Sequence, residues 1–336
     1  MRGDRRTAGS STEPRIDGLD WIKAVGIVTV VFIHGFFFWG LRRDALWDGI
    51  GVFVNFAVPG FFFAAGYLAY RAAEKAPEGF WGRRMQRVLW PYVVASFLAV
   101  AFQRLVLHHP IAWSDFPFQI LTGSAWGIYY FVPLLIGATL MAPLLGRWPV
   151  AALCLWAVFF VLPIANAVGW PPVRLGSLFA EFRNPVRWWG YYLSGWLCAR
   201  FALHTWLTRS AVRPVGVFAT ALAAAAIGIT GAVWVGPRPF DWERAIAEYV
   251  ARYSIIACLF ALGAMRPASG AVRWLSHNSY PLYLYHYFFL ELFWLVTGKD
   301  GFVPRFEAFL LTLVATVAWT RVGQWLLGAR ARTFLG

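Results

Sequence analysis

The sequence predicts an all-α membrane protein, a polytopic bundle of about ten transmembrane helices with both termini in the cytoplasm. Composition is the first observation: 60% of the 336 residues are hydrophobic and 14% are charged. This is too little polar surface to coat a soluble globule of that size. The second observation is that apolar stretches of about 20 residues, the length of one bilayer span, recur along nearly the whole chain. Short segments rich in Arg, Pro and Gly separate them.

The apolar stretches and the residues that interrupt them define the expected helices. The expected spans are 20–41, 47–72, 86–108, 126–146, 150–168, 188–208, 214–236, 245–266, 273–298 and 304–328. They form one membrane domain, 20–328, between cytoplasmic tails at 1–19 and 329–336. The outer connections 109–125 and 169–187 carry Pro and Trp, which suits re-entrant or surface-lying pieces better than structureless loops.

The basic residues indicate the orientation of the chain in the membrane. The formal net charge is +14, but the cations lie beside apolar spans and do not form one stripe, so no nucleic-acid partner is expected. With the amino terminus inside, most Lys and Arg residues of the loops fall in the cytoplasm, as the positive-inside rule requires. The strongest contribution is the loop after the second span, which holds Arg71, Lys75, Arg83, Arg84 and Arg87. We therefore expect a protein of the inner cell membrane.

Lys23 and His34 are ionisable residues within the first span. Eleven residues make three helical turns plus about 20°, so both side chains lie on one face, about 16 Å apart. Ionisable groups within a span usually face a cavity or a partner. A neutral imidazole is well suited to take a proton from a hydroxyl. His34 is thus a candidate general base, and the alternative is a histidine that only bonds across a helix interface.

A cluster of arginines begins the third expected span. Arg83, Arg84 and Arg87 stand at a helix amino terminus on the cytoplasmic side, and both arginine forks and helix amino termini bind phosphate well. The cluster predicts a site for a phosphorylated cytosolic donor. The alternative is a topology anchor that contacts anionic lipid headgroups.

Five further residues allow a functional or a structural interpretation. His286 lies about midway along the ninth expected span and could meet His34 in one cavity, or form an interhelical hydrogen bond alone. Trp126 and Tyr130 could line a path for a sugar, or serve packing. Glu248 and Arg252 are four residues apart, which an internal ion pair explains. No residues stand at metal-ligand spacing, so neither a metal nor a tightly bound cofactor is expected.

Three elements in the first part of the chain resemble one protein family. Lys23, ten residues and then His34 resemble the first-helix Arg/Lys-x10-His signature of the acyltransferase-3 membrane proteins. The stretch 61–68 is similar to that family's Phe-Phe-x-Ser-Gly-Phe-Leu segment, and Arg84-Met-Gln-Arg87 matches its Arg-x-x-Arg element. Later stretches, 126–135 and 275–286, resemble its Trp-Tyr-Leu and Ser-Tyr-x-x-Tyr-Leu-x-His segments.

The resemblance implies an O-acyltransferase that uses acyl-coenzyme A from the cytosol as donor substrate. The acceptor would be a hydroxyl of a glycan, a glycolipid or a small metabolite, with His34 as general base. The expected substrate-binding residues are Lys23, Arg83, Arg84, Arg87, Trp126, Tyr130 and His286. Lys23 stands where many relatives have Arg, so a point charge replaces a bidentate fork. The rival hypothesis is a non-enzymatic carrier that moves an acyl chain, a lipid or a glycan across the bilayer.

Overall fold

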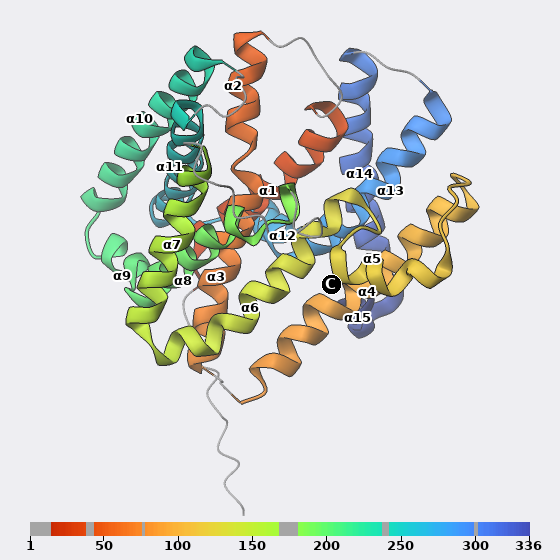
Figure 1. Cartoon of the computed structure of the whole chain (residues 1–336), viewed down its shortest axis with the longest axis horizontal. Helices are drawn as coiled ribbons and strands as arrows, with labels where there is room; N and C mark the ends of the chain where they lie inside the picture. The colour runs from red at the N-terminus through yellow and green to blue at the C-terminus, as the bar shows by residue number, and fades with distance from the viewer. Residues whose placement is uncertain (1–14, 38–43, 76–77, 168–180, 237–241, 299–301) are drawn as a thin grey trace, which may run out of the picture.

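The computed structural model describes residues 15–37, 44–75, 78–167, 181–236, 242–298 and 302–336. Within these ranges the chain is a helix bundle without strands (Figure 1), which confirms the predicted fold class. Its first half contains α1 (Asp17–Phe32), α2 (Ala45–Val54), α3 (Ala57–Lys75), α4 (Phe80–Leu105), α5 (Phe116–Thr122), α6 (Phe131–Arg147) and α7 (Pro149–Ala167). Its second half contains α8 (Trp189–Arg200), α9 (Leu203–Thr208), α10 (Val212–Val235), α11 (Trp242–Met265), α12 (Gly270–His277), α13 (Ser279–Thr297), α14 (Phe302–Leu327) and α15 (Ala331–Phe334).

Each expected span corresponds to helix in the described part of the chain. Seven helical segments are long and apolar enough to cross a membrane, and the count of ten spans stays a prediction. The seven are Asp17–Phe36, Ala45–Lys75, Phe80–Leu105, Gly127–Arg147, Val212–Val235, Trp242–Met265 and Pro304–Leu327. Most of the expected tail 1–19, and residues 38–41 of the first expected span, lie outside the described residues.

Three expected spans are broken where continuous helix was predicted. The span 47–72 is divided between α2 and α3 at Asn55, and 273–298 between α12 and α13 at Asn278. Pro59 and Pro281 fall in the first turn of α3 and of α13, where a missing N–H breaks no helical hydrogen bond. The span 188–208 is divided between α8 and α9 by Ala202, which has a φ of 50°. Apolar windows do not register such breaks, because the broken segments remain apolar throughout.

The first span ends in a wide helical turn. The α-helical hydrogen bonding of α1 gives way to a π-helical turn at Ile33–Phe37, and His34 lies within it. A π-turn holds one more residue than an α-turn. The direction of the His34 side chain is therefore set by an irregular piece of helix.

Small residues let helices cross at close range in the middle of the bundle. A Cβ atom placed on Gly66 of α3 would lie 1.9 Å from the carbonyl oxygen of Tyr192 in α8. The reverse holds for Gly195 of α8, whose Cβ would lie 1.9 Å from the Phe63 carbonyl oxygen. The small residue at position 66 thus admits another backbone at close range.

The first expected outer connection, 109–125, contains short helical pieces. A 3₁₀ turn (Trp113–Asp115) leads into α5, and Tyr92 of α4 donates a 2.6 Å hydrogen bond to the Ile120 carbonyl. This agrees with the expected surface-lying or re-entrant pieces. Of the second connection, 169–187, residues 169–180 lie outside the described residues, and the rest forms 3₁₀ turns at Glu181–Arg183 and Pro185–Arg187.

Candidate active site

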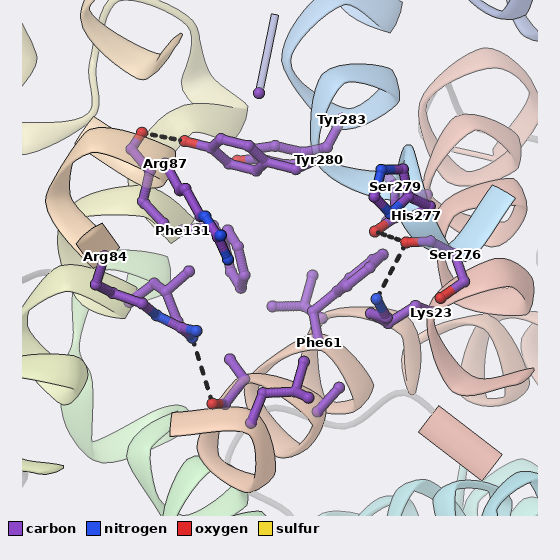
Figure 2. A pocket seen from close by; sticks show the side chains of 18 residues that line it. Lys23, Phe61, Arg84, Arg87, Phe131, Ser276, His277, Ser279, Tyr280 and Tyr283 are labelled. Atoms are coloured by element: carbon purple, nitrogen blue, oxygen red, sulfur yellow. Dashed lines mark hydrogen bonds between the residues drawn. The ribbon is translucent and has the colours of Figure 1, made fainter. Parts of the chain in front are cut away.

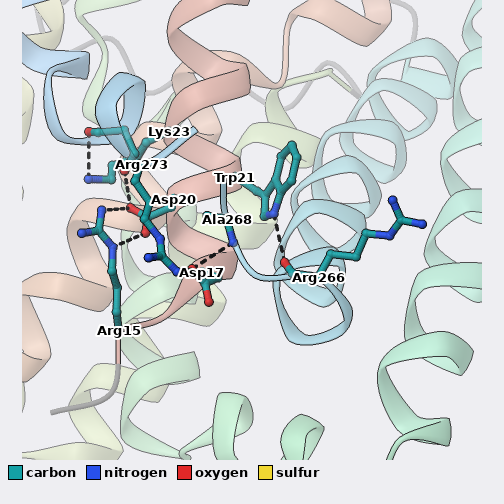
Figure 3. A network of polar contacts seen from close by, with 9 residues as sticks. Arg15, Asp17, Asp20, Trp21, Lys23, Arg266, Ala268 and Arg273 are labelled. Atoms are coloured by element: carbon teal, nitrogen blue, oxygen red, sulfur yellow. Dashed lines mark hydrogen bonds and ion pairs between the residues drawn. The ribbon is translucent and has the colours of Figure 1, made fainter. Parts of the chain in front are cut away.

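A polar network fixes the beginning of α1 against α12 (Figure 3). Arg15 forms an ion pair with Asp20 at 2.5 Å, and Asp20 accepts a hydrogen bond from the hydroxyl of Ser276. The carboxylate of Asp17 accepts from the backbone N–H of Ala268 at 3.1 Å. These contacts hold α1 and α12 in one fixed register. Lys23, one turn further along α1, is positioned by the same contacts.

The first cavity, which we call the lysine cavity, has a volume of about 440 Å³. Figure 2 shows Lys23 and Ser276 on one side of it and Arg84 and Arg87 on the other. Its lining residues are Lys23, Val30, Val58, Phe61, Ala64, Ala65, Leu68, Arg84, Arg87, Val88, Phe131, Leu135, Ser276, His277, Ser279, Tyr280, Tyr283 and Gly336. Basic groups therefore face one another across a largely apolar space.

Two basic residues of the lysine cavity bond to backbone carbonyls and to no carboxylate among the described residues. Lys23 donates to the Ser276 carbonyl at 3.1 Å, and Arg84 donates to the Ala65 carbonyl at 3.4 Å. The Nε of Arg84 is buried, and among the described residues it has no hydrogen-bond partner. Such an atom calls for an explanation.

The arginine cluster is divided between the cavity and its surroundings. Arg84 and Arg87 line the lysine cavity, whereas Arg83 is not among its lining residues. Arg83 is exposed and donates to the Glu78 carbonyl at 2.9 Å, at the beginning of α4. The structure thus brings two of the three predicted arginines to Lys23.

An open groove of about 460 Å³ adjoins the lysine cavity. The two spaces share Lys23, Leu68 and His277. The other residues of the groove are Arg15, Ile16, Leu19, Asp20, Arg71, Ala72 and Lys75. Basic side chains therefore continue from the cavity toward the end of the bundle where α1 begins.

The second cavity, which we call the histidine cavity, has a volume of about 420 Å³. It is lined by Val30, Ile33, His34, Val54, Asn55, Val58, Gly127, Ile128, Tyr130, Phe131, Phe182, Arg187, Trp188, Arg252, Tyr283 and Tyr287. Four of these side chains, those of Val30, Val58, Phe131 and Tyr283, also line the lysine cavity. We call these four residues the shared wall. The two cavities are thus neighbours, one on each side of the shared wall.

His34 is paired with His286, as the sequence suggested. The Nδ1 of His286 lies 2.8 Å from the Tyr283 carbonyl oxygen and 3.3 Å from that of Leu282. Because carbonyl oxygens can only accept, this nitrogen carries the proton. The Nε2 of neutral His286 then accepts from the Nδ1 of His34, which lies 3.2 Å away. The lone pair of neutral His34 is accordingly on its Nε2, so this is the nitrogen able to take up a proton.

The match to a known protein family covers nearly the whole chain. Residues 16–322 match the acyltransferase domain that defines the acyltransferase-3 family. The chain belongs to the acyltransferase-3 family. No match was found among curated proteins or among solved structures. The protein is therefore a multi-pass membrane acyltransferase, and the resemblance seen in its sequence is confirmed.

The two aromatic residues predicted near the acceptor path occupy different places in this acyltransferase. Tyr130 lines the histidine cavity and packs against Phe182, with ring centroids 5.8 Å apart. Trp126 does not line either cavity. Its ring lies 5.0 Å from that of Tyr287, a lining residue that also contacts His34. Trp126 thus packs against a lining residue of the histidine cavity and does not line the cavity itself.

Two arginines of the histidine cavity were not predicted as site residues of the acyltransferase. Arg252 forms the predicted ion pair with Glu248 and in addition reaches the cavity. Arg187 comes from the 3₁₀ turn before α8. Arg252 could have been recognised from the sequence, because a cation within an expected span usually faces a cavity or a partner. Arg187 lies in an expected loop beside Pro and Trp, so no feature of the sequence marked it as a site residue.

Proposed function

We propose that this acyltransferase transfers an acyl group from a cytosolic acyl-coenzyme A in the lysine cavity to a hydroxyl in the histidine cavity, with His34 as general base. The observation that carries the proposal is the position of His34, which lines one cavity and is bonded to the buried His286, while Lys23, Arg84 and Arg87 line the other cavity beyond the shared wall. The acceptor is a glycan, a glycolipid or a small molecule. We place the protein in the inner membrane, with the lysine cavity toward the cytosol.

The charge of the lysine cavity supports an acyl-coenzyme A as the donor. This donor carries several phosphates on its nucleotide and a thin arm with two amide groups that ends in the thioester. Lys23, Arg84 and Arg87 supply donors for phosphate oxygens. The adjoining groove adds Arg71 and Lys75. We place the nucleotide at the groove and the cavity entrance, and the arm in the interior near the shared wall.

The chemistry needs one base and one fixed orientation. The acceptor oxygen attacks the thioester carbonyl carbon while the Nε2 of His34 takes the hydroxyl proton. The carbon–sulfur bond then breaks, the acyl oxygen ester remains on the acceptor, and the thiolate of coenzyme A takes up the proton. Because His286 accepts from the Nδ1 of His34, it holds the ring in the tautomer that this step requires.

The decisive experiment uses the purified chain in lipid nanodiscs with radiolabelled acetyl-coenzyme A and a panel of hydroxyl acceptors. His34→Ala should reduce acyl transfer by about 100-fold or more, which is the usual contribution of a general base. His109→Ala is the matched control, because His109 is exposed and lines neither cavity. Binding of the donor should be unchanged in both variants.

Two outcomes would contradict the proposal. Full transfer by the His34→Ala protein would remove His34 as the base. Donor-independent movement of a lipid or a glycan across proteoliposomes, with no acyl transfer by the unmodified chain, would favour a carrier. The carrier also predicts that Arg84→Ala with Arg87→Ala leaves transport unchanged.

A further inference from the structure

The histidine cavity contains two arginines in addition to His34, the proposed general base. Its charged lining residues are two guanidinium groups, those of Arg187 and Arg252, and among the described residues that line it there is no carboxylate. A neutral sugar does not require two cations beside the base. The charge of the cavity therefore carries information about the acceptor.

Arg252 is held in place by a network of ion pairs. Its Nη2 donates to Glu248, whose other oxygen accepts from Arg244 at 3.0 Å. Arg244 in turn reaches Asp48 of α2 through two hydrogen bonds of 2.7 and 2.8 Å. The Nε of Arg252 is buried and, within the described part of the chain, has no hydrogen-bond partner. The network thus fixes the guanidinium but leaves one of its donors for a molecule in the cavity.

Arg187 forms neither an ion pair nor a hydrogen bond with the described residues. Its guanidinium lies over the rings of Phe182 and Trp188, 5.0 and 5.2 Å from their centroids. Arg187 is exposed, and it lines the same cavity as Arg252. Two cations therefore border one space. The aromatic rings orient Arg187 and leave its donors to the cavity.

Among the described residues, one carboxylate pairs with the two arginines of the cavity. Glu248 pairs with Arg252 and is shared with Arg244, and Arg187 has no ion pair with a described residue. An anion between Arg187 and Arg252 would offset their charge and satisfy their remaining donors, because guanidinium forks match oxyanions.

We infer that the acceptor carries an oxyanion, a phosphate or a carboxylate, which binds between Arg187 and Arg252 while a hydroxyl of the same molecule faces His34. This inference rests on the proposed function, since it concerns the acceptor of the same site. Two sources have this chemistry: a soluble acidic sugar and an anionic lipid headgroup that carries a hydroxyl.

The test compares acceptors that differ in charge. Transfer from acetyl-coenzyme A in phosphatidylcholine nanodiscs is measured to glucose 6-phosphate and glucuronic acid, with glucose as the neutral counterpart. Nanodiscs that contain phosphatidylglycerol test the lipid source. We expect kcat/KM for the preferred anionic acceptor to exceed that for glucose by about tenfold or more. Arg187→Gln should remove this preference, and Arg187→Lys should retain part of it.

Arg183→Gln is the matched control, because Arg183 precedes Arg187 by four residues and does not line the cavity. Binding of glucose 6-phosphate and of phosphatidylglycerol is measured in parallel with the His34→Ala protein, so that the inference can be judged without turnover. Equal use and equal binding of neutral and anionic acceptors, unchanged by Arg187→Gln, would overturn the inference while acyl transfer stands. Absence of acyl transfer together with anion binding that depends on Arg187 would instead overturn the proposed function alone.

Discussion

The lysine cavity and the histidine cavity differ in how they are built. The basic residues of the lysine cavity come from the first part of the chain, Lys23 on α1 and Arg84 and Arg87 on α4, where short motifs lie close together in sequence. The histidine cavity takes Arg187 from a turn and Arg252 from α11, far apart in the chain. The residues of the proposed donor site can thus be predicted from short sequence motifs. The residues of the proposed acceptor site are identified only by their positions in the structure.

The difference suggests a division of labour. The motif residues Lys23, Arg84 and Arg87 line the cavity proposed for the donor. Arg187 and Arg252, proposed to recognise the acceptor, lie outside the motifs. The proposed base connects the two cavities, because His34 belongs to the first motif but lines the second cavity. Variants on each side, and in the wall between them, can separate these roles.

The largest effect is expected from the shared wall. Val58→Trp adds a large ring where both cavities meet and should block contact between thioester and hydroxyl, lowering acyl transfer by about 100-fold or more. Donor binding, measured by equilibrium dialysis with acetyl-coenzyme A, should change little. Val58→Leu is the smaller control and should retain most activity. Full transfer by a folded Val58→Trp protein would show that the reactants meet elsewhere.

A second effect concerns the donor side alone. Arg84→Gln combined with Arg87→Gln removes two charge-assisted contacts, each worth about 1.5–3 kcal/mol, and should raise the KM for acetyl-coenzyme A by at least tenfold. The KM for the acceptor should stay the same. Arg209→Gln, an exposed arginine outside both cavities, serves as the control. A change in acceptor KM alone would reverse the assignment of the two cavities.

A smaller effect is expected from the partner of the base. His286→Leu removes one of the contacts of the His34 ring, the acceptor Nε2 of His286, and should lower kcat by about tenfold, because the ring is held less firmly in the required tautomer. His286→Gln keeps a carbonyl oxygen near that position and should recover part of the loss. Steady-state kinetics over a range of pH, with circular dichroism as a check of folding, distinguish this positioning role from a structural one. Equal losses in both variants would contradict it.

The sequence predicted the helical bundle, because its apolar stretches have the length of a membrane span. It left two roles open for His286, a meeting with His34 in one cavity or an interhelical hydrogen bond alone, and the structure shows a bond between the two rings. It did not separate Arg83 from Arg84, although one residue along a helix turns a side chain by about 100°. The sequence did not indicate Arg187 as a site residue. Arg187 lies in a 3₁₀ turn and Arg252 lies in α11, and no sequence pattern shows that these two segments border one cavity.

The first motif ends inside the wide turn at Ile33–Phe37. Nine of its ten intervening positions, residues 24–32, belong to α1, and Ile33 begins the turn, so the length of the motif sets how far the α-helix runs before His34. Deleting one of these positions would rotate His34 by about 100° and draw it about 1.5 Å toward Lys23. The imidazole would then leave His286. A change of length in this stretch should therefore be more damaging than most exchanges of one apolar side chain for another.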